Sequence, residues 1–252
     1  MRDPHHILIT GASSGIGAAM AFNYAAPGIV LSLHGRNAER LERIAVQARR
    51  RGAEVATRVG DVTETQNMAA WIEERNGVQK IDLVVANAGI GVSSSGVEGL
   101  AEQTRRVFDV NVNGIFNTIH PALSLMMKRK SGQIAIVSSL AGFRGFAGSS
   151  AYAASKAAVR VYGEGLRAEM APYGIEINVI CPGFIKTPMT EANPFRMPFL
   201  MSAARASRFV RKGLESNRAR IAFPWQMYAG IRLITALPQP LLDVIAKVLP
   251  RK

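Results

Sequence analysis

Short apolar runs alternate with longer stretches of helical pattern along most of the chain. The apolar runs have the length of buried strands and lie at residues 7–10, 29–34, 54–59, 81–87, 133–138 and 175–180. Helical patterns lie at residues 16–26, 38–51, 63–75 and 96–130, and from residue 152 onward. The helix at 96–130 is expected to bend near Gly114. Strands this apolar, separated by helices, indicate a parallel sheet that is covered on both faces.

The 252 residues fit a single α/β domain with a large core. Right-handed crossovers between the strands then give a Rossmann-type doubly wound sheet of about seven strands. The last strand is expected at residues 220–224, where Pro224 favours a strand end or a sheet edge. Within the domain 1–252 we expect a substrate-lid insertion at 187–217 and an apolar and basic helical tail at 225–252.

The net charge of +13 is concentrated in the last quarter of the chain. Residues 190–252 contain eleven Lys and Arg but three Asp and Glu, a net +8, which leaves +5 for the first 189 residues. Such asymmetry indicates an anionic partner. A phosphorylated cofactor, an anionic membrane surface and an acidic substrate all fit it. Nucleic acid is not expected, because no recognition motif accompanies the charge.

Cysteine and histidine usage gives no sign of a metal site or a disulfide. Cys181 is the single cysteine, and the four histidines do not form a ligand pattern. The N-terminal residues lack a charged segment followed by an apolar one, and no apolar run reaches about eighteen residues. A cytoplasmic protein is therefore expected, with the inner face of a membrane as a second location.

A glycine-rich turn joins the first strand to the first helix. Residues 10–17 read T-G-A-S-S-G-I-G, with the glycine spacing G-x-x-x-G-x-G. Glycine lets the backbone turn tightly and approach a pyrophosphate, and the following helix N-terminus offers free N–H groups. The sequence therefore predicts a dinucleotide site. Its expected contacts are Gly11, Ser13, Ser14, Gly15, Ile16 and Gly17.

The end of the second strand indicates which nicotinamide cofactor is used. Arg36 lies there, and no carboxylate follows before Glu39. A carboxylate would accept the ribose 2′-OH, whereas a guanidinium pairs well with a 2′-phosphate. The hydroxyl of Ser14 could add a further hydrogen bond. NADP(H) is therefore preferred, and NAD(H) stays the alternative if Arg36 only stacks on the adenine.

Tyr152 and Lys156 form the candidate acid/base couple. Residues four apart on a helix share a face, so these two side chains should stand together. A free tyrosine has a pKa of about 10, and a neighbouring cation favours its phenolate form. Ser139, thirteen residues before Tyr152, could hydrogen-bond a substrate oxygen as charge develops there. The alternative is a surface lysine beside a half-buried tyrosine.

These motifs, together with Asn87-Ala-Gly89, Asn111 and Pro182-Gly183, resemble the short-chain dehydrogenase/reductase family from about residue 5 to about residue 190. The resemblance implies further cofactor contacts at Asp61, Val62, Asn87, Ala88, Gly89, Tyr152, Lys156, Pro182, Gly183 and Thr187. It implies the catalytic set Asn111, Ser139, Tyr152 and Lys156, in which Asn111 belongs to a proton relay. Two alternatives stay open: Asn87 ties strands together, and Asp61 caps the helix near Thr63.

The resemblance also implies a reaction. A hydride passes between the nicotinamide and a carbonyl or alcohol carbon, while Tyr152 delivers or removes the proton. A preference for NADPH would favour carbonyl reduction. One alternative is an alcohol dehydrogenase that works in the oxidative direction. Another is a nicotinamide-binding sensor or scaffold without turnover.

An apolar segment at 192–201 occupies the position of the family's substrate lid. Its apolar side chains are Phe195, Met197, Phe199, Leu200 and Met201. Phe143 and Phe146 are expected to face the same pocket. These residues predict a hydrophobic alcohol or ketone as substrate. The alternative is that they belong to the core.

The tail departs from the ending of many short-chain reductases, because two apolar segments with basic neighbours lie at 227–237 and 241–249. Such segments suit the interface of an anionic membrane. They equally suit packing on the fold, in an oligomer or over the pocket. The resemblance further implies a homodimer or homotetramer that pairs through the helices containing Asn111 and Tyr152.

Overall fold

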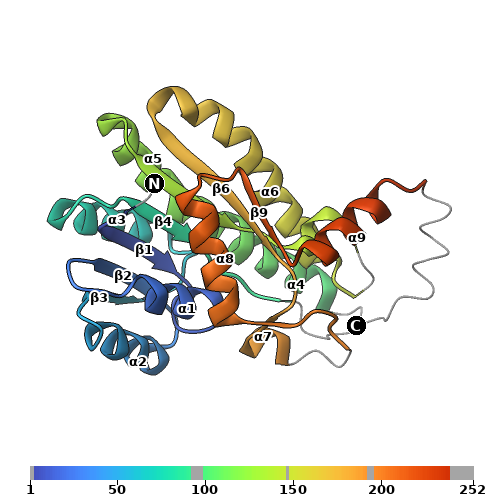
Figure 1. Cartoon of the computed structure of the whole chain (residues 1–252), viewed down its shortest axis with the longest axis horizontal. Coiled ribbons are helices and arrows are strands. Elements are labelled where there is room, and N and C mark those ends of the chain that lie inside the picture. The colour runs from blue at the N-terminus through green and yellow to red at the C-terminus, as the bar shows by residue number, and fades with distance from the viewer. Residues whose placement is uncertain (1–2, 92–98, 146–147, 192–195, 239–252) are drawn as a thin grey trace.

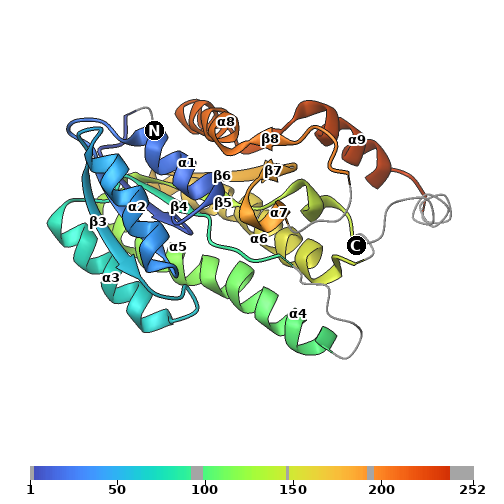
Figure 2. The ribbon, with the colours of Figure 1, turned by 90° about the horizontal axis from the view of Figure 1, so that it is seen from below.

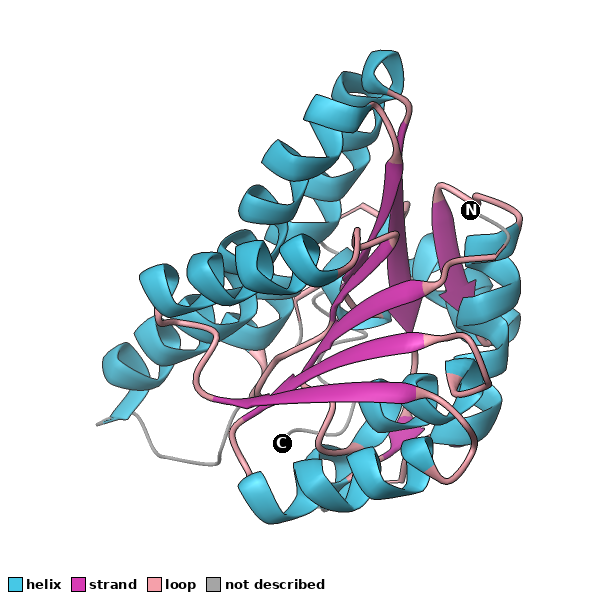
Figure 3. Cartoon of the chain, turned by 90° about the vertical axis from the view of Figure 1, so that its left-hand side faces the viewer, coloured by secondary structure: helices cyan, strands magenta, loops and turns pink. Residues whose placement is uncertain are grey.

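Seven parallel strands form one sheet at the centre of the protein (Figure 1, Figure 3). The computed structural model describes residues 3–91, 99–145, 148–191 and 196–238. The strands follow the order β3-β2-β1-β4-β5-β6-β9, and neighbours are parallel throughout. Their bounds are β1 His6–Thr10, β2 Val30–Gly35, β3 Glu54–Val59, β4 Leu83–Ala86, β5 Gly132–Val137, β6 Ile175–Pro182 and β9 Arg220–Phe223. The predicted doubly wound sheet is confirmed, and β9 is an edge strand that Pro224 follows.

Helices cover both faces of this sheet, because successive strand residues point to opposite sides. Ile7 and Ile9 of β1 pack into one apolar cluster, whereas Leu8 between them packs into the other. The first layer contains α1 (Gly15–Tyr24), α2 (Ala38–Arg49) and α8 (Ala203–Glu215), and the second contains α3 (Thr65–Val78), α4 (Leu100–Phe108), α5 (Gly114–Arg129) and α6 (Ser150–Met170). Figure 2 shows α8 and α4 on opposite sides of the molecule.

The long helical stretch predicted at 96–130 is interrupted in its middle. A π-helical turn, Asp109–Asn113, joins α4 to α5 directly before Gly114, where the sequence predicted a bend. Residues 96–98 of that prediction lie outside the described residues. π-Helical turns inside helices are often found at functional sites. This turn carries the buried Asn111.

The segment predicted as a lid, 187–217, divides into two parts. After β7 (Ile185–Lys186) come the short helix α7 (Pro188–Glu191) and β8 (Met201–Ser202), which pairs with β7. The helix α8 then packs Ala206, Val210 and Leu214 into the core beside α1. The lid prediction is therefore wrong for α8, because the apolar face of that helix is part of the domain core.

The tail begins with α9, Trp225–Thr235, at the right of Figure 1. Ile231 is buried, and Met227 and Tyr228 are half-buried against the same small apolar cluster. Trp225 and Leu233, in contrast, are 71% and 69% exposed. One face of α9 thus belongs to the fold. The second predicted segment, 241–249, lies outside the described residues.

None of the described helices is both long enough and apolar enough to cross a membrane.

Candidate active site

A cleft of about 550 Å³ opens at the carboxyl ends of the central strands. The chain winds outward in both directions from β1 and β4, and such switch points are where doubly wound sheets bind ligands. The predicted residues that line the cleft are Gly11, Ser13, Ser14, Gly15, Ile16, Arg36, Asp61, Val62, Asn87, Ala88, Gly89, Ser139, Tyr152, Lys156, Pro182, Gly183 and Thr187. Of the predicted catalytic and cofactor-binding residues, Gly17 and Asn111 do not line it.

The turn between β1 and α1 has the geometry of a pyrophosphate cradle. Gly11 has φ +66° and Gly15 has φ +59°, a region that side chains disfavour. A Cβ at Gly11 would lie 2.9 Å from the Cα of Ala88. A Cβ at Gly17 would collide with the carbonyl oxygen of Gly11, so Gly17 lets α1 pack against the turn. The N-terminus of α1 faces this turn, which therefore fits the diphosphate of a dinucleotide.

Asn87 ties β4 to the glycine turn while it also lines the cleft. Its side-chain Nδ2 donates to the carbonyl oxygens of Thr10, at 3.0 Å, and Gly11, at 3.2 Å. Its backbone N–H donates to the hydroxyl of Thr10 at 3.1 Å. The alternative structural role considered for Asn87 is thus observed.

Asp61 closes a turn ahead of α3 but does not cap that helix, which begins at Thr65 with Glu64 at its N-cap, so the alternative role is not observed. Its Oδ1 accepts hydrogen bonds from the backbone N–H and the hydroxyl of Thr63, at 3.1 and 3.0 Å. Burial alone would raise the pKa of Asp61, but the hydrogen bonds from Thr63 and the charge of Arg36 outweigh it and hold the pKa below its usual value. The carboxylate is therefore charged at neutral pH.

Two arginines gather where β2 ends. The side chain of Arg36 is 51% exposed, and its Nη1 lies 3.6 Å from the Oδ2 of Asp61. Arg40, in the first turn of α2, also lines the cleft but was missed by the sequence analysis. A signal for it existed, because Asn37 is a favoured N-cap residue, and it places Arg40 in the first turn of the helix that follows β2. The pair forms a positive corner at this end of the cleft.

Lys156 lies buried on α6, at the other end of the cleft. It is 4% exposed, and its Nζ donates to the carbonyl oxygen of Val137 at 3.0 Å. The Nζ stands 5.9 Å from the centre of the Tyr152 ring. Burial lowers the pKa of Lys156 to about 8. With that pKa, about 90% of the lysine is protonated at pH 7.

The side chain of Ser139 lies close enough to Tyr152 to lower the pKa of the phenol, while its Oγ donates to the carbonyl oxygen of Pro182 at 3.4 Å. We predicted that Lys156 lowers the pKa of Tyr152. The shift has the opposite direction, because burial raises the pKa of the phenol and the neighbouring side chain of Ser139 offsets only part of that effect. Tyr152 therefore carries its proton at neutral pH, in the form that can donate it.

Comparison with known proteins identifies the family. The model of the short chain dehydrogenase family matches residues 5–196. This chain belongs to the short-chain dehydrogenase family. An uncharacterized oxidoreductase of Myxococcus xanthus is 38% identical over 95% of this chain and 95% of its own length. A 3-oxoacyl-[acyl-carrier-protein] reductase of Thermotoga maritima is 36% identical over 74% of this chain and 76% of its own.

Among solved structures, a short-chain dehydrogenase from Sphingobium yanoikuyae in complex with NADPH superposes with a TM-score of 0.80. It is 27% identical in sequence and covers 93% of this chain and 96% of its own. The present chain is accordingly an NAD(P)-dependent oxidoreductase. The prediction of the family and of an enzyme is confirmed.

Asn111 is buried beneath the cleft of this short-chain dehydrogenase. Its Nδ2 donates to the carbonyl oxygen of Ile90 at 3.0 Å and to the hydroxyl of Ser155 at 3.1 Å. Its Oδ1 accepts from the N–H of Ile90 at 2.8 Å. A Cβ at Gly89 would lie 3.1 Å from that Oδ1 and 3.3 Å from the Nζ of Lys156, so both side chains converge on this edge. The part of Asn111 in a proton relay stays a prediction.

The apolar residues expected around the substrate are distributed differently. Phe143 does not line the cleft and packs edge-on against Tyr228 instead. Met201 is buried in the core, whereas Phe199 and Leu200 are 55% and 45% exposed. Phe146 and Phe195 lie outside the described residues. The expectation that Phe143 faces the pocket is therefore wrong.

Several further lining residues were missed by the sequence analysis. They are His34, Gly35, Asn37, Gly60, Val110, Val137, Ser138, Ile185, Met189 and Thr190. Most stand at the ends of strands, where the parallel topology brings them to one edge. The arrangement of strand ends could have indicated them, but no local motif does.

Within the described part of the chain, no group of three or more His, Cys, Asp and Glu side chains is arranged to hold a metal ion.

Proposed function

We propose that this short-chain dehydrogenase uses NADP(H) to reduce the carbonyl group of an apolar substrate. The observation that carries the proposal is that Tyr152, Ser139 and the buried Lys156 line the same cleft as Arg36, with the Nζ of Lys156 5.9 Å from the centre of the Tyr152 ring. The name of the T. maritima relative, a 3-oxoacyl reductase, supports the direction of the reaction.

The bound nicotinamide would supply the hydride. Ser139 would hold the carbonyl oxygen through its hydroxyl while negative charge develops there. Tyr152 would donate its proton to that oxygen, and the charge of Lys156 would stabilise the phenolate that forms. Asn111 fixes the backbone of Ile90 next to this site, and a water beside it would complete the proposed relay that returns the proton through Lys156.

Two cations at the end of β2 support NADP(H). Arg36 and Arg40 would share the 2′-phosphate, with the fork of a guanidinium suited to its oxygens. The solved structure with NADPH is a relative's complex that is consistent with this choice. The alternative is that Asp61 keeps Arg36 paired, in which case NAD(H) would serve equally well.

The test is NADPH oxidation with a panel of apolar ketones, aldehydes and quinones, repeated with NADH. At least one compound should be turned over, and kcat/KM with NADPH should exceed that with NADH by about tenfold or more. If alcohol oxidation were faster than carbonyl reduction for every carbonyl compound and its alcohol, the result would favour the oxidative alternative. Tight cofactor binding without turnover across the panel would favour a sensor and contradict the proposal.

The proposal includes two contacts outside the cleft. The exposed Trp225 and Leu233 of α9, next to the exposed Arg232, support reversible attachment to an anionic membrane. A homodimer or homotetramer that pairs through α5 and α6 is part of the same proposal and rests on membership of the family.

A further inference from the structure

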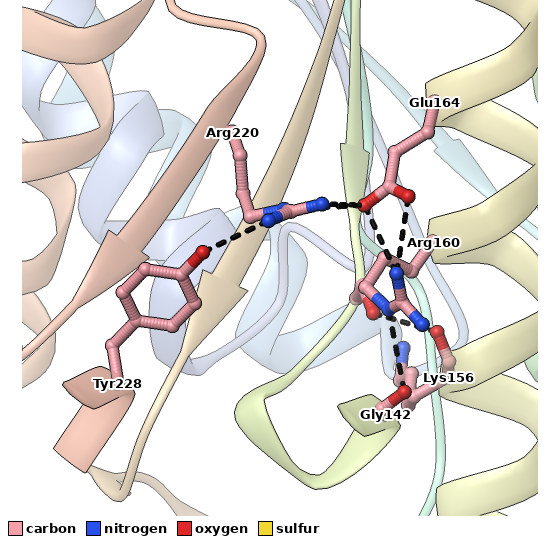
Figure 4. A network of polar contacts seen from close by, with 7 residues as sticks. Gly142, Lys156, Arg160, Glu164, Arg220 and Tyr228 are labelled. Atoms are coloured by element: carbon pink, nitrogen blue, oxygen red, sulfur yellow. Dashed lines mark hydrogen bonds and ion pairs between the residues drawn. The ribbon is translucent and has the colours of Figure 1, made fainter. Parts of the chain in front are cut away.

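A network of charged hydrogen bonds joins the catalytic helix to the C-terminal part of the chain (Figure 4). Glu164 of α6 accepts from Arg160 through both carboxylate oxygens, at 3.1 and 3.0 Å. Its Oε1 also accepts from the Nε of Arg220 on β9, at 3.1 Å. Arg220 in turn donates from Nη1 to the hydroxyl of Tyr228 on α9, at 2.8 Å. Glu164 is therefore shared by two arginines from different elements.

Phe143 is held at the centre of this network. The guanidinium of Arg160 lies 4.6 Å from the centre of its ring, and that of Arg220 lies 5.3 Å away. The ring of Tyr228 meets it edge-on with the centroids 5.5 Å apart. Cations near an aromatic ring and an edge-on ring pair are both attractive contacts. The network thus fixes the end of the 3₁₀ turn Leu140–Phe143.

That turn rests directly on the backbone of the catalytic lysine. A Cβ at Gly142 would lie 2.7 Å from the carbonyl carbon of Lys156, so glycine is needed for this approach. The carbonyl oxygen of Gly142 accepts from the Nε of Arg160 at 3.3 Å. The hydroxyl of Ser138 donates to the carbonyl oxygen of Lys156 at 2.7 Å. Every displacement of the turn would therefore move groups next to Lys156.

Ser139 begins the same turn. Its Oγ accepts from the N–H of Ala141 at 3.1 Å, and its carbonyl oxygen accepts from the N–H of Gly142 at 3.0 Å. The position of its hydroxyl, which lowers the pKa of Tyr152 and donates to the carbonyl oxygen of Pro182 at 3.4 Å, thus depends on where the turn lies. Neither Glu164 nor Arg220 lines the cleft, so each can influence the reaction only through the residues between.

We infer that Glu164 and Arg220 are positioning residues for carbonyl reduction. Through Arg160 and Phe143 they hold Ser139 in place beside Tyr152, and through Tyr228 they hold α9 against the turn. Glu164 and Arg220 are 56 residues apart in the chain, and their ion pair joins α6 to β9. No sequence motif contains both residues. The inference rests on the proposed function, because it assigns Ser139 its role at the substrate oxygen.

The test compares Glu164→Gln with a matched control, Glu215→Gln. Glu215 pairs with Arg211 four residues earlier on α8, at 2.9 Å, in the same i, i+4 arrangement as Arg160 and Glu164. Arg211 contacts α1 rather than the turn, because its Nη1 donates to the carbonyl oxygen of Asn23. Both substitutions remove one carboxylate charge and keep the size of the side chain.

Glu164→Gln should lower kcat about tenfold or more, since small misplacements of catalytic groups have effects of this size or larger. The dissociation constant for NADPH should change by less than about twofold, because the nucleotide end of the cleft is not touched. Arg220→Gln should have a similar effect, and the double variant should lose little more, since both belong to one network. Glu215→Gln should leave kcat unchanged.

Hydrogen–deuterium exchange of the full-length protein gives a readout that does not depend on turnover. Exchange at residues 139–144 should rise in Glu164→Gln and stay unchanged in Glu215→Gln, at a temperature well below both melting points. Equal exchange and equal kcat in Glu164→Gln and the wild type would overturn the inference. If the wild type reduces no carbonyl compound, the proposed function fails, and the exchange data alone then decide whether Glu164 positions the turn.

Discussion

The two ends of the cleft are built in different ways. At the nucleotide end, backbone atoms form most of the cleft wall. The glycine turn after β1 and the turn that Asp61 closes after β3 form a cradle, which the hydrogen bonds from Asn87 to Thr10 and Gly11 hold together. At the substrate end, a 3₁₀ turn and α9 are held by side chains that are distant in sequence, such as Glu164 and Arg220. A cradle of backbone atoms suits a chemical group that does not vary, such as the diphosphate of a dinucleotide. A network of side chains can instead differ between enzymes that act on different substrates.

The largest expected effect separates the two ends. Tyr152→Phe removes the proton donor at the substrate end, so kcat should fall by about 10²–10⁴-fold, the usual contribution of general acid catalysis. The affinity for NADPH should change little, because the ring is retained. Steady-state kinetics and fluorescence titration of NADPH measure the two quantities. Near wild-type reduction of a good carbonyl substrate by this variant would show that Tyr152 is not the acid.

The second prediction concerns the nucleotide end alone. Arg36→Asp removes a charged hydrogen bond worth roughly 1.5–3 kcal/mol, so the affinity for NADPH should fall by about tenfold or more. The ratio of kcat/KM values for NADPH and NADH should shift toward NADH. Arg58→Asp is the matched control, because Arg58 is exposed on the neighbouring β3 and does not line the cleft. The same ratio in both variants would contradict the role of Arg36.

The nucleotide end was also the part that the sequence could predict. β3 has the predicted bounds, 54–59, and the glycine turn begins and ends where the motif places it. These features follow from local rules: the apolar period of a strand and the positive φ of Gly11 and Gly15. Most of the seventeen predicted residues in the cleft come from segments that follow strands, because parallel strand ends meet at one edge, whereas Tyr152 and Lys156 come from α6.

The substrate end could not be predicted in the same way. Phe143 was expected in the pocket, but two arginines and Tyr228 hold it away from the cleft. Nothing near Phe143 in the sequence indicates these partners, because Arg220 and Tyr228 come from β9 and α9. The pKa of Tyr152 likewise depends on burial, and spacing alone gives only the neighbouring charge. Long-range packing decides both outcomes.

A third prediction addresses Lys156, which stands between the two ends. Burial lowers its pKa to about 8, so the protonated form that assists Tyr152 is lost as the pH rises through that value. The kcat/KM for NADPH, which reports the free enzyme, should therefore fall about tenfold between pH 7 and pH 9. A flat profile over this range would show that the charge of Lys156 is not required.

Unfolding would not explain such a fall. The pKa of Lys156 is depressed in the folded protein, so between about pH 8 and its ordinary value of 10.5 the unfolded chain binds more protons. Titration of this group alone thus makes folding more favourable as the pH rises through that window. Activity and the contribution of Lys156 to stability should change in opposite directions, which thermal melts over the same range can check.

The smallest expected effect tests whether the substrate end extends to a membrane. Arg232→Gln should weaken binding to anionic vesicles about fivefold, because one basic residue near such a surface contributes about 1 kcal/mol. Arg232 lies exposed on α9 beside the exposed Leu233, so its replacement leaves the packing of Ile231 and Tyr228 intact. Truncation after Pro224 would be a poorer test, since it removes those two packed side chains as well.

Arg43→Gln, an exposed position on the distant α2, is the matched control. Sedimentation of the full-length protein with anionic liposomes at low salt measures the affinity. Protein that stays in the supernatant, or equal losses in both variants, would show that the apolar surface of α9 serves a partner other than a membrane.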